Sequence, residues 1–319
     1  MPCFPVVIPL LVAAIMAATG SLFPRRALDV AGILTSAAIL AVCCWLAKLS
    51  ANHTIVYWFG NWQPAPHSHF PVGICFMIDP VGAGMAALVA GLVLTAFIFS
   101  WGYFQSVKAF YHAMMLVFMA AMCGLCLTGD LFNLFVWFEL MTAAGVGLCG
   151  YQSQERAPLL GALNFAVSNT VGAFISLTGV ALLYAYTGSL NMSEVGQSLL
   201  IQHTGPLFVL MTFVLVSCGF LVKSAAFPFH FWLADAHAVA PTPVCILFSG
   251  VMVELGVYAV ARLYWVIFAP SLGAQSDGVK IVLITMGSLG ALVGGIFCFG
   301  QRHLKRLLAF STISHVGLM

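Results

Sequence analysis

Long apolar segments alternate with short polar connections along almost the whole chain. A spanning helix needs about 20 mostly apolar residues to cross about 30 Å of hydrocarbon. The first segment lacks a preceding basic region, so we expect a retained helix and not a cleaved signal. The pattern predicts an all-α polytopic membrane protein with about ten transmembrane helices, the tenth starting near residue 304 and still running at Met319. The other nine cover residues 3–23, 27–48, 79–101, 109–128, 131–150, 159–186, 206–228, 243–268 and 279–299.

The longest polar connection covers residues 49–78. Tryptophan favours the membrane interface, and proline favours turns and extended backbone. We therefore expect an extended loop lying at the interface or a short hairpin. The expectation rests on Trp58, Trp62, Pro64, Pro66 and Pro71.

Basic residues in the short connections predict the orientation, because they favour the cytoplasmic side. If the first connection, with Arg25 and Arg26, is cytoplasmic, the opposite side holds Lys48 and Lys280, with Arg262 nearer a helix end. This asymmetry favours an outward N-terminus. The cytoplasmic side then also holds Lys108, Arg156, Arg302, Lys305 and Arg306.

Composition agrees with a bilayer environment. Only 6% of the residues are charged and 62% are hydrophobic, whereas soluble domains are about 25% charged. The net charge of +2 is small and its basic residues are scattered, so we expect no nucleic-acid partner. Cys123 and Cys126 form a CxxC without a second pair or a nearby histidine. Because metal sites need about four ligands, we predict no metal here and interpret the pair as small apolar side chains.

Three ionisable residues lie well inside predicted spans: Glu139, Lys223 and Glu254. A charge at the centre of a membrane helix costs about 2.5–3.5 kcal/mol on insertion scales. Three such residues therefore predict a polar interior. Three others lie near span ends, where they can reach headgroups or water: Asp79, Asp130 and Arg262.

Glu139 and Lys223 are the clearest candidates for proton handling. Glu139 follows Asp130 by nine residues, which places it about 13 Å further along a helix and close to mid-bilayer. Lys223 follows seventeen uncharged residues. A buried glutamate beside a movable cation can hold or release a proton. The alternative is a static ion pair that locks the helix packing.

The segment after Lys223 adds a backbone signal and further titratable groups. Pro228 cannot donate to the carbonyl of Ser224, so it predicts a kinked or broken helix lining a cavity. The next ionisable residues are His230, Asp235 and His237. Because histidine titrates near pH 6.5, they are candidates for proton uptake at the membrane surface, or they only form hydrogen bonds in a loop. His315, with hydroxyl neighbours in the last span, is a relay candidate or a packing residue.

Three blocks resemble a known family: LTGDLFNLFVWFEL, then FLVKSAAFPFHFWLADAHAVAPTPVCILFSGVMVELGVYAVARL, then LKRLLAFSTISHVGLM. They are similar to the proton-translocating antiporter-like subunits of respiratory complex I, membrane-bound hydrogenases and Mrp-type cation/proton antiporters. The likeness runs from about residue 70 onward. FNLFVWFE and TGSLNMSEV look closest to the D subunit of Mrp antiporters.

The resemblance implies about fourteen helices, with two inverted five-helix repeats that each contain a broken helix. Residues 1–104 would hold helices 1 to 3 and an outer loop. Residues 105–268 would form the first repeat, with the buried Glu, Lys and Glu, and residues 269–319 would begin a truncated second repeat. The family's proton-handling Glu and Lys match Glu139 and Lys223, and its broken seventh helix matches Pro228.

Two departures from the family are visible. Many relatives carry a second lysine where this chain has Glu254, so the sign of that charge is reversed. The chain also ends inside the tenth helix, so we expect either a fragment or a second chain that supplies the remainder.

The resemblance implies a proton-translocating subunit that moves protons through Glu139, Lys223 and Glu254, with His315 as a link onward. Its partners would be other membrane subunits of a hetero-oligomeric complex in a bacterial inner membrane. Protons would move, with sodium as a further candidate ion. We expect no cofactor, and any NADH:quinone oxidoreductase or hydrogenase activity would belong to partner subunits. Two alternatives are a non-translocating assembly subunit and a solute transporter that binds substrate with its buried charges.

Overall fold

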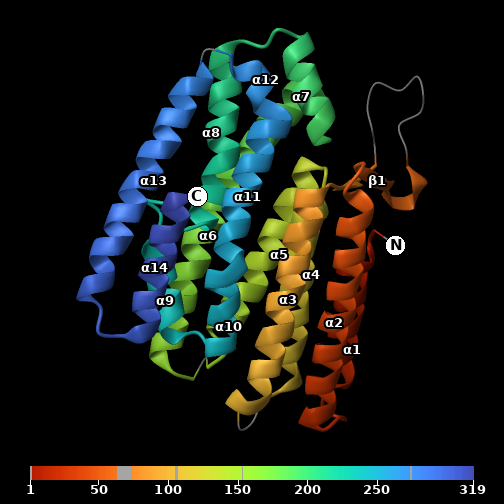
Figure 1. The fold of residues 1–319 in the computed structure, drawn as a ribbon, viewed down its shortest axis with the longest axis vertical. Coiled ribbons are helices and arrows are strands. Elements are labelled where there is room, and N and C mark those ends of the chain that lie inside the picture. The colour runs from red at the N-terminus through yellow and green to blue at the C-terminus, as the bar shows by residue number, and fades with distance from the viewer. Residues whose placement is uncertain (1, 63–72, 105–106, 153, 274) are drawn as a thin grey trace.

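The computed structural model describes residues 2–62, 73–104, 107–152, 154–273 and 275–319. In this part of the chain, eight helices are long and apolar enough to cross a membrane. They lie side by side in one bundle, with α2 and α3 at one flank and α13 at the other (Figure 1). Every segment predicted to span forms helix over most of its length. The first and last are short, with 16 and 15 residues.

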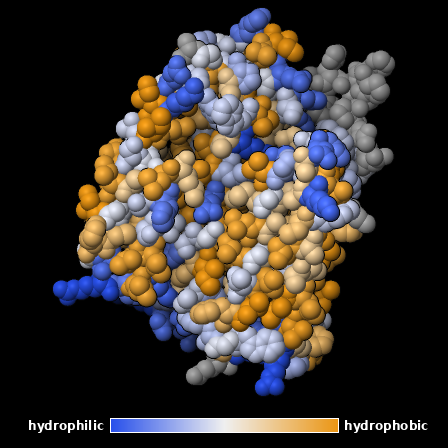
Figure 2. Space-filling view, in the orientation of Figure 1, coloured by the Kyte–Doolittle hydropathy of each residue, from blue (hydrophilic) through white to orange (hydrophobic). Residues whose placement is uncertain are grey.

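The main helices follow the apolar segments closely. Figure 2 shows apolar side chains over much of the bundle's flank, with many of the hydrophilic ones at its two ends. The helices are α1 (Phe4–Thr19), α2 (Arg25–Ser50), α3 (Pro80–Tyr103), α4 (Ala109–Leu127), α5 (Leu131–Cys149), α6 (Arg156–Thr187), α8 (Pro206–Lys223), α13 (Gln275–Gly300) and α14 (Leu304–Leu318).

Residues 242–272 form one helical rod with two π-helical turns. A π turn inserts an extra residue and shifts the face that later side chains occupy. Glu254 lies just after the first of these turns. The rod consists of α10 (Thr242–Leu247), η2 (Phe248–Met252), α11 (Val253–Leu263), η3 (Tyr264–Phe268) and α12 (Ala269–Leu272).

The predicted hairpin is present between α2 and α3. Strand β1 (Ile55–Trp58) pairs antiparallel with β2 (Cys75–Ile78), and the short helix η1 (Phe59–Asn61) follows β1. Trp62 is exposed. The three prolines behind the expectation, Pro64, Pro66 and Pro71, lie outside the described residues.

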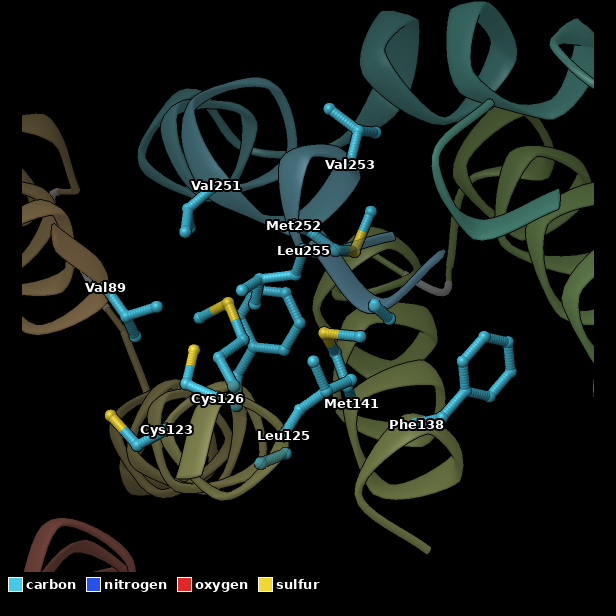
Figure 3. Close-up of a cluster of buried hydrophobic side chains, with 14 of the residues drawn as sticks. Val89, Cys123, Leu125, Cys126, Phe138, Met141, Val251, Met252, Val253 and Leu255 are labelled. Atoms are coloured by element: carbon cyan, nitrogen blue, oxygen red, sulfur yellow. The ribbon is translucent and has the colours of Figure 1, made fainter. Parts of the chain in front are cut away.

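An apolar cluster fills the space between α3, α4, α5 and the π turn η2 (Figure 3). Cys123 and Cys126 are fully buried in it, beside Val89, Met141 and Val251. The CxxC pair therefore packs as apolar side chains, as predicted.

Two helices differ from the prediction. The short α7 (Met192–Ile201) was not predicted; Asn191 begins it by accepting hydrogen bonds from the backbone N–H groups of Ser193 and Glu194. The segment predicted to span 206–228 ends at Lys223, and α9 (Phe231–Val239) begins after a turn.

The turn after Lys223 stops α8 with a Schellman pattern. The Ala226 N–H donates to the Leu221 carbonyl at 3.1 Å and the Ala225 N–H to the Val222 carbonyl at 3.0 Å. This pattern needs a left-handed residue, normally glycine, and here Ala225 holds φ at 51°. Trp232 Nε1 also donates to the Val222 carbonyl at 2.9 Å. The break is thus built from hydrogen bonds as well as from Pro228.

Ala225→Gly should stabilise the chain by about 0.5–1 kcal/mol, because glycine adopts left-handed backbone without steric cost but loses more entropy on folding. Thermal unfolding in detergent measures the change. Ala226→Gly is the matched control, because Ala226 does not have a positive φ and should gain nothing. A lower midpoint for Ala225→Gly would contradict this account.

Candidate functional site

Lys223 is the last residue of α8 and is fully buried. Its Nζ donates to Thr142 Oγ1 of α5 at 2.5 Å. The amine also lies 4.4 Å from the centroid of the Phe138 ring and 5.5 Å from that of Phe165. Ring faces stabilise a cation, and a hydroxyl can accept from or donate to an amine. The pocket can therefore hold Lys223 in either charge state.

The break after α8 and the pocket around Lys223 share side chains. Phe165 of α6 stacks on Trp232 of α9, with centroids 4.6 Å apart and planes 11° apart. The same Trp232 donates to the Val222 carbonyl at the end of α8. A movement of α9 would therefore reach one wall of the Lys223 pocket.

Glu139 approaches Lys223 from α5 and interacts with it electrostatically. The two side chains form no ion pair within 4.0 Å in the described part of the chain. Glu139 is half-buried, and its Oε1 is buried without a hydrogen-bond partner among the described residues. The static Glu139–Lys223 pair left open above is not the geometry present, because Thr142 holds the amine.

Glu254 lies on α11 and interacts electrostatically with His315 of α14. It is half-buried and His315 is exposed. Two residues away, Gly256 brings α11 against the end of α8, where an added Cβ would lie 2.6 Å from the Phe220 carbonyl oxygen. These four acid and base groups thus form two interacting pairs, Glu139 with Lys223 and Glu254 with His315. Three ionisable residues were predicted to lie inside the membrane spans: Glu139, Lys223 and Glu254. Of these, Lys223 alone is fully buried.

The groups predicted for proton uptake are mostly inside the protein. His230 is 2% exposed and His237 is 1% exposed, so a surface position is wrong for both. His237 shares the buried face of α9 with Leu233, one turn earlier, and its Nε2 has no hydrogen-bond partner among the described residues. Asp235 remains at the surface and accepts from Arg306 Nη2 at 2.9 Å.

A polar pocket of about 470 Å³ opens next to the end of α9. Lys305 lines it and donates from Nζ to the Ala240 carbonyl at 2.8 Å. Lys305 also interacts electrostatically with His237. One residue of the pocket wall, Lys305, therefore interacts with a buried histidine. Its other lining residues are Tyr103, Phe104, Gln152, Val239, Ala240 and Pro241.

Arg262 is buried, in contrast to its predicted access to headgroups or water, with a side chain 5% exposed. Its guanidinium pairs with Asp79 Oδ1 at 3.1 Å and donates to the carbonyls of Cys126 at 3.2 Å and Met77 at 3.1 Å. It also donates to the Tyr258 hydroxyl. Glu254, Tyr258 and Arg262 recur every four residues, a spacing that places them on one helix face. That spacing could have indicated that Arg262 takes part in a buried network with Tyr258, Asp79 and the nearby carbonyls.

Asp130 begins the helix that carries Glu139 and Thr142. Its Oδ1 accepts from the Asn133 N–H at 2.7 Å, as expected of a helix N-cap. Burial raises the pKa of the Asp130 carboxyl, while the N–H groups of Asn133 and Phe132 oppose that rise. The cap fixes where α5 starts and so the height of Glu139 in the bundle.

Two buried ionisable residues were not among those predicted. Asp29 of α2 and His112 of α4 contact each other near one end of the bundle. Asp29 is a lone acid in an apolar span, which was the available signal. In the described residues, no three His, Cys, Asp or Glu side chains gather as a metal site.

Comparison with known proteins gives a consistent family. The family model described as NADH:quinone oxidoreductase/Mrp antiporter, TM, matches residues 128–319. The N subunit of the NADH-quinone oxidoreductase of Desulforudis audaxviator is 34% identical over 99% of this chain and 62% of its own length. The D subunit of the probable K(+)/H(+) antiporter of Rhizobium meliloti is 31% identical over 99% of this chain and 58% of its own length. The chain thus spans about three fifths of these relatives.

Solved structures of related complexes have the same fold as this chain. A chain of the archaeal membrane-bound sulfane sulfur reductase superposes with a TM-score of 0.90 at 25% identity, covering 99% of this chain and 63% of that one. A chain of the Mrp complex from Dietzia sp. DQ12-45-1b gives 0.86 at 26% identity, covering 99% and 57%. The resemblance predicted from residue 70 onward is confirmed and extends over nearly the whole chain. The chain is an integral multi-pass membrane protein that belongs to the NADH:quinone oxidoreductase/Mrp antiporter family.

Proposed function

We propose that this chain is the proton-translocating part of a subunit in a multi-subunit membrane complex. The observation that carries the proposal is Lys223, a fully buried amine at a helix break, held by Thr142 and interacting with Glu139. Ionisable groups inside membrane helices are costly and usually functional. A buried amine with a neutral hydrogen-bond partner and a carboxylate nearby is suited to gaining and losing a proton.

Lys223 is the movable group in this mechanism. Thr142 follows Glu139 by three residues, so the two acceptors lie about 4.5 Å apart along α5. The amine holds a proton while it approaches the Glu139 carboxylate, which stabilises the ammonium form. When it returns to Thr142, its proton can pass onward. The lysine therefore alternates between two positions on one helix face.

Protons would arrive through the pocket lined by Lys305 and pass His237 before reaching Lys223. Asp235 at the surface and His230 near the break would assist uptake. Glu254 would be the next relay and His315 the link beyond it. Support for this order comes from the Glu254–His315 interaction and from the close packing of α11 on the end of α8.

The family fold gives the proposed organisation. Residues 105–268 would be the first inverted five-helix repeat, and α8 and α9 would be its broken seventh helix, with Pro228 in the break. Residues 1–104 would precede it, and residues 269–319 would begin the second repeat of a fourteen-helix subunit. Relatives of similar sequence are antiporter and quinone oxidoreductase subunits.

We propose other membrane subunits as partners, in a bacterial inner membrane, because the similar structures come from multi-subunit complexes. Protons are the transported ion and sodium is a candidate for exchange. Any oxidoreductase step would take place in a partner subunit.

The test is proton flux through the complex reconstituted in vesicles. Glu139→Gln and Glu254→Gln should each lower flux by more than about tenfold, because an amide of the same shape cannot transfer the proton. Glu155→Gln is the matched control, since Glu155 is exposed before α6 and should leave flux unchanged.

Three other outcomes are informative. Wild-type flux in both glutamine variants would overturn the proposal. Normal flux per assembled complex with reduced assembly would indicate an assembly subunit. Thermal stabilisation of the chain by a small solute, lost in Glu139→Gln, would indicate a solute transporter.

A further inference from the structure

A second buried polar cluster lies where α2, α3 and α4 meet, in the part of the bundle away from α13 (Figure 1). Asp29 of α2 is 2% exposed and His112 of α4 is fully buried. Asp29 Oδ1 lies 2.7 Å from His112 Nε2, and Asp29 Oδ2 lies 3.3 Å from Arg25 Nε. Because a carboxylate only accepts, Nε2 carries the hydrogen in this contact.

Arg25 connects this cluster to the end of α3. Its guanidinium donates to the carbonyls of Phe104 at 2.5 Å, Trp101 at 2.9 Å and Ser100 at 3.2 Å. These carbonyls lie in the last turn of α3 and just beyond it, where a helix leaves its acceptors unpaired and attracts cations. Asp29 thus orients the cation that caps α3.

One ring nitrogen in this cluster makes no hydrogen bond with the described residues. His112 Nδ1 is buried and has no hydrogen-bond partner in the described part of the chain. Phe97 stacks on the ring at a centroid distance of 6.2 Å. Arg25 and Asp29 sum to zero charge, so a proton on Nδ1 would leave one net positive charge in apolar surroundings, which is unfavourable. Arg25 is the cation best placed to leave, because its side chain is 24% exposed.

We propose that His112 and Asp29 form a proton-binding latch that releases Arg25 from the end of α3. A hydronium ion transfers a proton to Nδ1, so one O–H bond breaks, one N–H bond forms and a water molecule is left. The resulting imidazolium, already in contact through Nε2, then balances the charge of the Asp29 carboxylate without Arg25. No other covalent bond changes. Arg25 then moves toward water, and the Ser100, Trp101 and Phe104 carbonyls lose their cap.

The latch borders the polar pocket near α9. Tyr103 and Phe104, at the end of α3, line that pocket together with Lys305. If protons enter there, which rests on the proposed function, protonation of His112 would loosen one wall of the entrance. The latch itself does not depend on that role.

Of the ionisable groups described around this end of α4, His112 is the one whose side-chain type changes charge between pH 5 and 8. α1 carries no ionisable side chain. From α5, Glu139 interacts with Lys223 and Cys149 contacts the Ala236 carbonyl. From α11, Tyr258 and Arg262 contact α4 at Cys126, about 21 Å along the helix from His112. Three phenols, Tyr103, Tyr111 and Tyr151, also lie near this end of α4.

Hydrogen exchange of the intact chain tests the latch. Peptides covering the end of α3 and the start of α4 should exchange several-fold faster at about pH 5 than at about pH 8, the range over which histidine changes charge, after correction for intrinsic rates. His112→Gln should remove this difference, because its amide can still donate to Asp29 but cannot take up a proton. His203→Gln is the control, since His203 is exposed near α8, and it should keep the wild-type difference.

Nitrogen-15 NMR of labelled histidine gives a readout independent of fold stability. The His112 signal, identified by its loss in His112→Gln, should change from a neutral ring to a doubly protonated ring over that pH range. A ring that stays neutral throughout, or an exchange difference that survives in His112→Gln, would overturn the latch. Neither result bears on flux in Glu139→Gln, so failure of the latch and failure of the proposed function are distinguishable.

Discussion

Lys223→Met is expected to abolish proton flux through the reconstituted complex while the chain stays folded. Methionine has a similar volume and suits the surroundings of Phe138 and Phe165, so the pocket stays filled. Lys223 forms no ion pair within 4.0 Å in the described part of the chain, so its replacement breaks no close charge pair. The expected flux is lower than wild type by about a hundredfold or more, since a positioned proton-transfer group contributes about 10²–10⁴-fold.

The controls separate charge from packing. Lys280→Met removes an exposed lysine that pairs with Asp277 and should leave flux unchanged. Thr142→Val removes the hydroxyl that holds the amine and should lower flux less than Lys223→Met, because Glu139 remains. Flux at the wild-type level in Lys223→Met would show that the buried amine only stabilises the helix break.

The apolar spans could be predicted because length and hydropathy are properties of a single segment. The end of α8 could not, because its turn uses Ala225 in a left-handed conformation where glycine is the usual signal. The short α7 was missed since its ten residues carry no spanning pattern. Pro228 did predict a break, although the helix stops five residues before it.

Part of the candidate site also depended on contacts that sequence does not specify. Glu139 and Lys223 could be selected because charges are rare in apolar spans. Thr142 could not be selected, because a threonine is ordinary in an apolar helix until α5 packs against the end of α8. The burial of His230 and His237 likewise depends on how α9 folds back into the bundle.

Arg262→Met is expected to destabilise the chain by about 3 kcal/mol, within the range for breaking a buried charge pair and its hydrogen bonds. The substitution leaves the Met77 and Cys126 carbonyls and the Asp79 carboxylate without this donor. Gly82 shows how closely these elements meet, since an added Cβ would lie 2.6 Å from the Cys126 carbonyl oxygen. Chemical unfolding in detergent micelles measures the loss.

Asp79→Asn should cost less, about 1 kcal/mol, because the Asp79 side chain is 30% exposed and solvent screens its charge. In the double variant the two losses should sum to more than the measured total, because removing both partners leaves no unpaired carboxylate. Arg302→Met, at an exposed position, should change nothing. If Arg262→Met kept wild-type stability but lowered flux, the Arg262 network would belong to the proton route that passes Glu254 on the same helix face, and not to the framework that holds α11 in place.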